Sequence, residues 1–302
     1  MSHTSAIAGI DLGGTRIKAM LRNAETGEEM DRKILPTNDG DEPADTPVWA
    51  EAIHQLIQDW ESEHQTPIEA VGIACPGLAH RDGSHIVHMP GRLQGLEGFD
   101  FNSFLSRETY VINDAQAALL GELLEGAAQG YKDLLMLTLG TGVGGAILMD
   151  GRLLRGHLGR AGHCGHLCMD PNGEPGITGL PGTLEDAIGN HNIAKRSGGK
   201  FTSTKDLTDA VQAGDKEAKA IWDKSVHHLG CGIASLVNIV DPEAVLIGGG
   251  IAQVGDLLFD SLKDVLDDVE WRPGTEGVKI LRASLGEWAG AIGALPMEPK
   301  NT

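Results

Sequence analysis

Three short glycine clusters, each at the end of a predicted β-strand, constrain the fold of this chain more than any other feature. They are Gly13-Gly14-Thr15, Gly140-Thr141-Gly142 and Gly248-Gly249-Gly250. Glycine leaves backbone N–H groups bare, so a turn of this kind lets a phosphate group approach the main chain closely. One cluster alone is a weak signal, because glycine is also common in ordinary turns. Three clusters at strand ends indicate a chain that binds a phosphorylated ligand.

The first two clusters have the same surroundings, which indicates two related halves. The first cluster joins the apolar runs Ala6–Ile10 and Arg16–Leu21, which are predicted to form two strands linked by a tight turn. The pattern begins again at Leu134–Leu139, and in both halves helical stretches follow the paired strands. Two related α/β domains with mixed sheets are therefore predicted, with a boundary between Asp114 and Ala128.

The composition narrows the class of partner. The 302 residues include 43 acidic and 24 basic side chains, which gives a formal net charge of −19. Nucleic-acid-binding proteins cluster Lys and Arg, and anionic membrane surfaces attract basic segments, so we expect neither partner. No apolar run approaches the length of about 20 residues that spans a bilayer, and no signal-peptide pattern is visible. Because four cysteines also make no disulfide framework, we expect a cytoplasmic protein.

Two carboxylates are placed where they can act on a phosphorylated ligand. Asp11 precedes the first glycine cluster and can hold a hydrated Mg²⁺ on the phosphates, although an ordinary turn residue is the alternative. Asp114 follows the predicted strand Tyr110–Ile112 and opens a helix, so it is either the N-cap of that helix or a general base. The phosphate-binding clusters favour the catalytic role for Asp114.

The order and spacing of the motifs resemble the ROK family of sugar kinases and sugar-responsive repressors. The motifs that carry the resemblance are Asp11-Leu12-Gly13-Gly14-Thr15, Gly72-Ile73-Ala74-Cys75-Pro76-Gly77, Asn113-Asp114-Ala115, Gly140-Thr141-Gly142-Val143-Gly144-Gly145, Gly165-His166, Leu184-Glu185, Ile247-Gly248-Gly249-Gly250 and Ala289-Gly290-Ala291-Ile292-Gly293. The resemblance implies a two-domain, actin-like ATPase (ribonuclease H-like) fold. The implied domains are residues 1–116, joined by a C-terminal helix over 286–302, and residues 117–285.

The resemblance also implies a reaction. A hexose kinase would use ATP and Mg²⁺ to phosphorylate a sugar hydroxyl, and the first expectation is the conversion of glucose to glucose 6-phosphate. Recognition of one hexose rather than another depends on one or two hydroxyl contacts, so mannose, fructose, allose and N-acetylhexosamines stay open. Family members of this length are usually dimers, which implies a homodimer.

The positions of the motifs assign a role to each candidate residue. The resemblance implies that Asp114 accepts the proton of the attacking sugar hydroxyl and that the sugar is bound by Asn113, His163, His166 and Glu185. The implied ATP-binding residues, of which Asp11 also holds Mg²⁺ through water, are Asp11, Gly13, Gly14, Thr15, Gly140, Thr141, Gly142, Gly248, Gly249 and Gly250.

The chain departs from the family pattern in two places. His163 replaces the glutamate of the family's Glu-x-Gly-His motif, and a neutral imidazole offers one donor and one acceptor where a carboxylate offers acceptors only. The segment Gly176–Thr183 aligns with the family's Cys-x-Cys-Gly-x-x-Gly-Cys zinc segment but has none of its cysteines, so no structural zinc is expected. A replacement site at His163, Cys164, His166 and Cys168 would crowd four ligands around one tetrahedral ion. We instead expect hydrogen bonds and stiff Pro and Gly residues to hold this loop.

Two further classes of function are alternatives. A sugar-responsive repressor of this family carries a helix-turn-helix segment before its first glycine cluster, but only ten residues precede Asp11 here, and the net charge opposes DNA binding. A non-catalytic sugar sensor would explain the altered zinc segment, but the phosphate-binding clusters and Asp114 oppose it. The sequence therefore favours the kinase.

Overall fold

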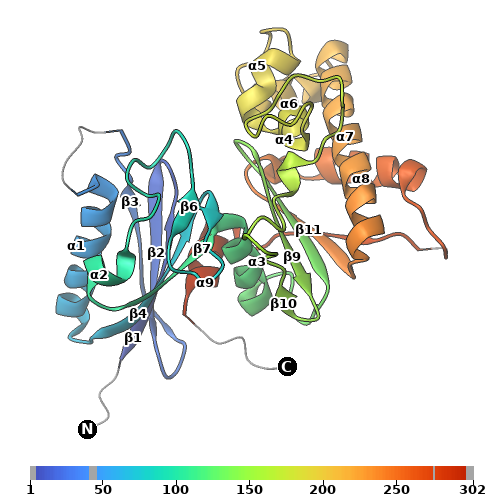
Figure 1. The fold of residues 1–302 in the computed structure, drawn as a ribbon. Coiled ribbons are helices and arrows are strands. Elements are labelled where there is room, and N and C mark those ends of the chain that lie inside the picture. Colours follow the sequence, from blue (N-terminus) through green and yellow to red (C-terminus); the bar gives the residue numbers. More distant parts are fainter. Residues whose placement is uncertain (1–4, 41–45, 275, 297–302) are drawn as a thin grey trace. The chain divides into compact units, whose positions relative to one another are not determined.

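The computed structural model describes residues 5–40, 46–274 and 276–296, and the chain divides into two compact units, which are drawn in Figure 1. The units are Met1–Gln129 with Arg155–Arg160 and Glu287–Thr302, and Gly130–Leu154 with Ala161–Gly286. The expected domain boundary after residue 116 stays a prediction. Of the expected C-terminal helix over 286–302, the described part is a 3₁₀ turn and a helix that ends at Ala294, and residues 297–302 lie outside the described residues.

The first unit is built on a five-stranded mixed sheet with the strand order β3-β2-β1-β4-β7. Strands β1, β2 and β3 pair antiparallel, whereas β4 and β7 continue the sheet from β1 in parallel. A small hairpin, β5–β6, follows β4. The strands are β1 (Ala6–Leu12), β2 (Arg16–Asn23), β3 (Glu29–Pro36), β4 (Ile68–Cys75), β5 (Leu78–Ala79), β6 (Ile86–His88) and β7 (Glu108–Asn113).

Alternate residues of the first sheet contact different partners on its two faces. Ala8 and Ile10 of β1 belong to an apolar core that also includes Trp49, Ile53 and Trp60 of α1. Gly9, which lies between them, contacts α9, and Figure 1 shows α1 and α9 on opposite sides of the sheet. The helices of this unit are α1 (Val48–His64), α2 (Phe101–Leu105), α3 (Asp114–Glu125) and α9 (Ala289–Ala294), and η4 (Gly286–Trp288) is a 3₁₀ turn before α9.

Helix α9 packs so closely that its main chain lies against the main chain of the neighbouring strands and of α3. A Cβ atom at Gly9 would lie 2.1 Å from Ala291 O, and one at Gly72 would lie 1.5 Å from Ala294 O. A Cβ atom at Gly293 would lie 1.7 Å from Ala117 O of α3. Glycine is required at these positions because no other residue leaves room for the neighbouring main chain.

The second unit repeats the topology of the first. Its sheet has the order β10-β9-β8-β11-β12, with β8, β9 and β10 antiparallel and with β11 and β12 parallel to β8. The strands are β8 (Leu134–Leu139), β9 (Val143–Met149), β10 (Arg152–Leu153), β11 (Ala244–Gly248) and β12 (Lys279–Arg282). The prediction of two related α/β halves with mixed sheets is therefore confirmed.

Helices α7 and α8 pack in the apolar core on this sheet. Trp222 and Leu229 of α7 and Leu262 of α8 are buried there together with Leu137 and Ile247 of the strands. The helices and 3₁₀ turns are η1 (Cys164–His166), α4 (Leu184–Ile188), η2 (Asn190–Asn192), α5 (Ile193–Arg196), α6 (Thr204–Gln212), α7 (Lys216–Val240), η3 (Ile251–Val254) and α8 (Asp256–Val269). Within the described ranges, no helix is both long and apolar enough to cross a membrane.

One predicted helix is interrupted. The sequence predicts a helical stretch around Leu184–Lys195, and the structure has α4, η2 and α5 there, with α4 ending at Ile188. After α4, the N–H groups of Asn190 and His191 donate to carbonyl oxygens outside the helix, at 2.9 Å each. These tertiary hydrogen bonds replace intrahelical ones and divide the stretch into short elements.

Candidate active site

The turn between β1 and β2 presents unpaired N–H groups. Gly13 N donates to Arg16 O at 3.1 Å, and Thr37 fixes the turn by donating its hydroxyl to Gly13 O at 2.6 Å and its N–H to Thr15 O at 3.0 Å. Within the described residues, the N–H groups of Gly14 and Thr15 have no acceptor. A turn that is fixed through its carbonyls and leaves two N–H groups free can bind an anion.

Asp11 lies at the end of β1 beside a cation. Its Oδ2 accepts from Lys18 Nζ at 2.9 Å, and both side chains are mostly buried. Asp11 and Lys18 are cross-strand partners in the β1–β2 hairpin. The pair thus sits directly beside the first glycine turn, where charges can act on phosphates.

Asn113, and not Asp114, is the N-cap of α3. Asn113 Oδ1 accepts from the N–H groups of Ala115 at 3.0 Å and Gln116 at 3.2 Å. Its amide nitrogen donates to Gly77 O and to Asp114 Oδ1, both at 3.0 Å. Asn113 is buried, and these four bonds use both lone pairs of its side-chain oxygen and both N–H groups of its amide. In this structure the side chain therefore holds the Asp114 carboxyl group.

The surroundings of the Asp114 carboxyl shift its pKa upward. Burial raises its pKa to about 6, and the negative charge of Asp11 acts in the same direction. The N–H of Ala115, the positive charge of Arg92 and the amide of Asn113 oppose the rise. A carboxylate with a pKa nearer to neutrality takes up a proton more readily than an ordinary aspartate does.

The turn between β8 and β9 has the same design in the second unit. Gly140 N donates to Gly142 O at 3.0 Å, while the N–H groups of Thr141 and Gly142 find no acceptor in the described part of the chain. A Cβ atom at Gly140 would meet nothing within 4 Å, so the space beside this residue is open. The second turn can therefore also receive an anion.

A cavity of about 690 Å³ lies beside the second turn. Gly140 and Thr141 line it on one side, Gly250 and Ile251 on another, and Thr204 at the start of α6 on a third. Its size is typical of small-molecule sites. Gly249 does not line the cavity; it has φ +89° and passes Leu139 so closely that a Cβ atom would lie 2.3 Å from Leu139 O.

Three of the predicted sugar-binding residues lie together in the second unit. His166 Nδ1 is 3.5 Å from Glu185 Oε1, and the His163 ring is parallel to the His166 ring with 6.0 Å between centroids. Glu185 also approaches the turn between β8 and β9, because a Cβ atom at Gly142 would lie 2.5 Å from Glu185 Oε2. Burial and the neighbouring His166 lower the pKa of His163, so His163 is neutral at neutral pH.

The loop around Gly176–Thr183 is closed by its own main chain. Gly182 N donates to Glu174 O at 2.9 Å, Gly176 N donates to Leu180 O at 2.8 Å, and Met169 N donates to Gly182 O at 2.8 Å. The expectation that hydrogen bonds hold this loop is confirmed. A second cavity, of about 440 Å³, borders the loop and is lined by none of the predicted site residues.

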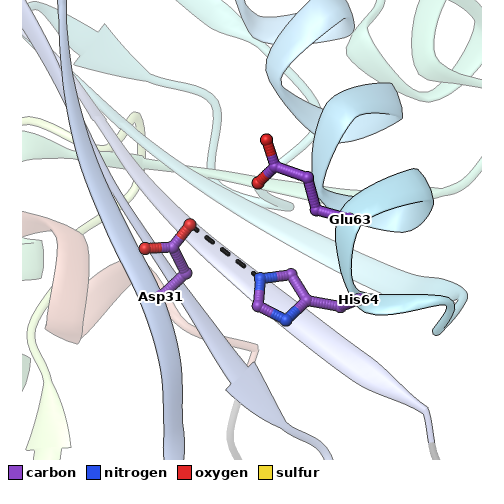
Figure 2. A group of neighbouring side chains, drawn as sticks. All are labelled: Asp31, Glu63 and His64. Atoms are coloured by element: carbon purple, nitrogen blue, oxygen red, sulfur yellow. Dashed lines mark ion pairs between the residues drawn. The ribbon is translucent and has the colours of Figure 1, made fainter.

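Figure 2 shows the group of potential metal ligands that lies elsewhere, in the first unit. Asp31, Glu63 and His64 offer ligand atoms within 4.8 Å of one another, and no such group occurs in the loop 163–168 or elsewhere among the described residues. Lys33 Nζ lies 2.7 Å from Glu63 Oε2 and 3.6 Å from Asp31 Oδ2. The Trp60 indole donates to Asp31 Oδ2 at 2.7 Å. This group is an ion-pair network around an ammonium group rather than a vacant cation site.

Four residues beside the two glycine turns, two in each unit, were not predicted to act there. Arg92 reaches the first turn, since a Cβ atom at Gly14 would lie 3.8 Å from its guanidinium group. Lys18 pairs with Asp11, which the β1–β2 register could have indicated, because cross-strand partners of opposite charge attract. Asn190 and His191 bind the second turn through tertiary contacts, for which the sequence carries no local signal.

Comparison with known proteins gives this site its context. The profile of the ROK family matches residues 7–300. The chain is 33% identical to a glucokinase of Halalkalibacterium halodurans, over 94% of this chain and 92% of that protein. It is likewise 33% identical to an N-acetylmannosamine kinase of Escherichia coli O157:H7, over 94% and 95%. Its structure is similar to a Streptomyces griseus glucokinase in complex with glucose and AMPPNP, with a TM-score of 0.76, 27% identity, and coverage of 96% and 98%.

Proposed function

Since the chain belongs to the ROK family and has the actin-like ATPase fold of its sugar kinases, we propose that it is an ATP-dependent glucokinase. It transfers the γ-phosphoryl group of ATP to a hydroxyl of glucose and forms glucose 6-phosphate. One observation carries the proposal: the same chain holds a carboxyl group with a pKa of about 6 and two glycine turns with unpaired N–H groups. A proton acceptor and anion-binding turns are the parts that phosphoryl transfer to an alcohol needs.

Each part of the reaction has its residues in this proposal. Asp114 accepts the proton of the sugar hydroxyl as that oxygen attacks the γ-phosphorus, and Asn113 orients the carboxylate through the 3.0 Å bond to Oδ1. Glu185 and His166 accept and donate hydrogen bonds to other sugar hydroxyls. His163, neutral and half-buried, offers one donor and one acceptor to the same ligand.

The phosphates of ATP bind to the main chain. The first turn supplies Gly13, Gly14 and Thr15, and the second supplies the N–H groups of Thr141 and Gly142 together with Gly140. These donors stabilise the charge that spreads over the transferred group. Gly250 and the cavity beside it receive the nucleoside, whereas Gly248 and Gly249 shape the end of β11.

Mg²⁺ fits the same site through Asp11. Lys18 occupies Oδ2 of Asp11, and Oδ1 has no partner among the described side chains and main chain, so one hard oxygen ligand is available for a hydrated ion. When bound, Mg²⁺ neutralises charge on the ATP phosphates. The ion pair with Lys18 orients the Asp11 carboxylate.

The pH dependence of the reaction follows from the pKa of Asp114. A base acts only when it is unprotonated, so kcat/KM for the sugar is expected to fall tenfold for each pH unit below about 6 and to level off above it. An aspartate with the ordinary value of 3.8 would move this limb to near pH 4. A pH–rate profile measures the limb, and a profile flat down to pH 4 would contradict the assignment.

A coupled assay of ADP release with a panel of hexoses tests the function and ranks the substrates. We expect glucose to give the highest kcat/KM among glucose, mannose, fructose, allose, N-acetylglucosamine and N-acetylmannosamine. A preference for N-acetylmannosamine, the substrate in the name of one relative, would keep the kinase and change its substrate. If the protein bound ATP but released ADP with none of these sugars, the kinase proposal would be refuted and a non-catalytic sensor would be favoured.

We further propose that the protein is a homodimer of the cytoplasm. The four cysteines are free thiols, which suits a reducing compartment. The net charge of −19 supports the absence of nucleic-acid and membrane partners and opposes a repressor. Light scattering of the purified protein measures the oligomeric state, and a mass of 31.9 kDa would mean a monomer.

A further inference from the structure

We propose that His191, held by Asp186, is the positioning residue for the phosphate-binding turn Gly140–Gly142. The inference rests on the proposed function, because it assigns the turn to ATP phosphates. Neither residue belongs to the motifs that define the family resemblance.

His191 binds one carbonyl of the turn twice. Thr141 O accepts from His191 N at 2.9 Å and from His191 Nδ1 at 2.8 Å. The preceding carbonyl, Gly140 O, accepts from Asn190 N at 2.9 Å. Two consecutive peptide groups of the turn are therefore anchored on the segment between α4 and α5.

The hydrogen bonds to Gly140 O and Thr141 O fix the direction of the N–H groups that follow them in the chain. In a trans peptide group the C=O of one residue and the N–H of the next point in opposite directions. The bonds to Gly140 O and Thr141 O therefore turn the N–H groups of Thr141 and Gly142 away from His191. These are the two N–H groups of the turn that have no acceptor among the described residues and that the proposed function assigns to phosphate.

Asp186 holds the ring in this orientation. Its Oδ1 lies 3.0 Å from His191 Nε2, and its Oδ2 accepts from the Thr183 hydroxyl at 2.6 Å. Although burial alone would raise the pKa of Asp186, the hydrogen bonds from Thr183 and His191 hold that pKa below its ordinary value. Each ring nitrogen of His191 therefore faces an acceptor, the Thr141 carbonyl on one side and the Asp186 carboxylate on the other.

The contacts that hold Asp186 begin at Thr183, the last residue of the loop Gly176–Thr183. Thr183 caps α4, and its hydroxyl donates to Asp186 Oδ2. The chain of contacts Thr183–Asp186–His191–Thr141 thus joins the replaced loop to the phosphate-binding turn. The loop and the turn are therefore connected through side-chain hydrogen bonds.

The corner between α4 and α5 does not need the imidazole to fold. The Arg196 guanidinium donates to Gly189 O at 2.6 Å and to Ile188 O at 3.3 Å, which ties the end of α4 to α5. The main-chain bonds of Asn190 and His191 also survive any change of the His191 side chain. Removal of the ring should therefore loosen the turn while the fold stays intact.

Calorimetric binding of Mg·AMPPNP and of glucose tests the inference without turnover. We expect His191→Ala to weaken the binding of AMPPNP about tenfold, the effect of one lost hydrogen bond, and to leave glucose binding unchanged. His191→Asn keeps a donor for Thr141 O and should recover most of the affinity. Asp186→Asn should weaken AMPPNP binding less, and in the double variant the two losses should not add, because both act through one ring.

The matched control is His228→Ala, which removes another histidine of the second unit. His228 Nδ1 lies 2.7 Å from Lys224 O within α7, and among the described residues it makes no hydrogen bond with the turn, so AMPPNP binding should match the wild type. Unchanged AMPPNP affinity in His191→Ala would overturn the inference and leave the kinase standing. Equal losses for AMPPNP and glucose, or a fall in melting temperature, would show a merely structural role. Weaker AMPPNP binding in a protein that phosphorylates no sugar would support the inference and refute the kinase, and a wild type without nucleotide binding would refute both.

Discussion

Asp114→Asn is expected to lower kcat at least about a thousandfold, because an amide cannot accept the proton of the sugar hydroxyl. Sugar binding should survive, since Asn is isosteric with Asp. Its amide oxygen can keep the bonds from the Asn113 amide at 3.0 Å and the Ala115 N–H at 2.8 Å. Steady-state kinetics gives kcat, and calorimetry gives the dissociation constant of the sugar.

The control for this variant is Asp59→Asn, which removes an exposed carboxylate of α1 and should leave both constants unchanged. If Asp114→Asn kept more than about a tenth of the wild-type kcat, Asp114 would not be the base. If sugar binding failed together with turnover, Asp114 would act mainly in binding the substrate. The combination of lost turnover and retained binding is specific to a proton acceptor.

Gly293→Ala is expected to destabilise the protein by at least about 3 kcal/mol, the upper range for overpacking. The added methyl group would lie 1.7 Å from Ala117 O and 2.5 Å from Gly121 N, both main-chain atoms of α3. Helix α9 cannot easily move away from α3, because its other side packs closely against Gly9 and Gly72 of the sheet. Unfolding in urea, followed by circular dichroism, measures the free energy of unfolding.

Gly274→Ala is the matched substitution for comparison. A Cβ atom there would meet nothing within 4 Å, and Gly274 has no positive φ. The free energy of unfolding of this variant should therefore stay within about 0.5 kcal/mol of the wild-type value. Equal stability of the two variants would mean that α9 does not pack as closely as the structure indicates.

The strands and most helices could be predicted because apolar runs and glycine turns are local signals. For example, the sequence predicts a helical stretch around Lys216–Val240, and α7 lies there. Strand β3 (Glu29–Pro36) escaped prediction because charged and polar side chains interrupt its apolar residues, as suits the half-exposed edge of a sheet. The interruption of Leu184–Lys195 escaped it because the cause lies in hydrogen bonds to distant residues.

For the candidate site, the sequence indicated which residues lie close together, but it did not indicate the surroundings that set their pKa values. The clustering of Glu185, His166 and His163 agrees with the resemblance, although their roles toward sugar stay predictions. Asp114 was identified from its motif, but the rise of its pKa depends on burial and on Asp11, a hundred residues away in the chain. Such long-range electrostatics has no local sequence pattern.

The main-chain hydrogen bonds that close the loop from Glu174 to Gly182 bear on the conditions under which this loop keeps its structure. A cysteine-bound zinc ion makes a loop vulnerable to metal starvation, chelators and peroxide, because thiolates must stay both reduced and loaded. Backbone hydrogen bonds carry none of these dependences. Even Cys168, which is exposed, meets Thr183 through the main chain, so oxidation of its thiol leaves that pairing in place. The hydrogen bonds that close this loop therefore require neither a bound zinc ion nor reduced thiolates.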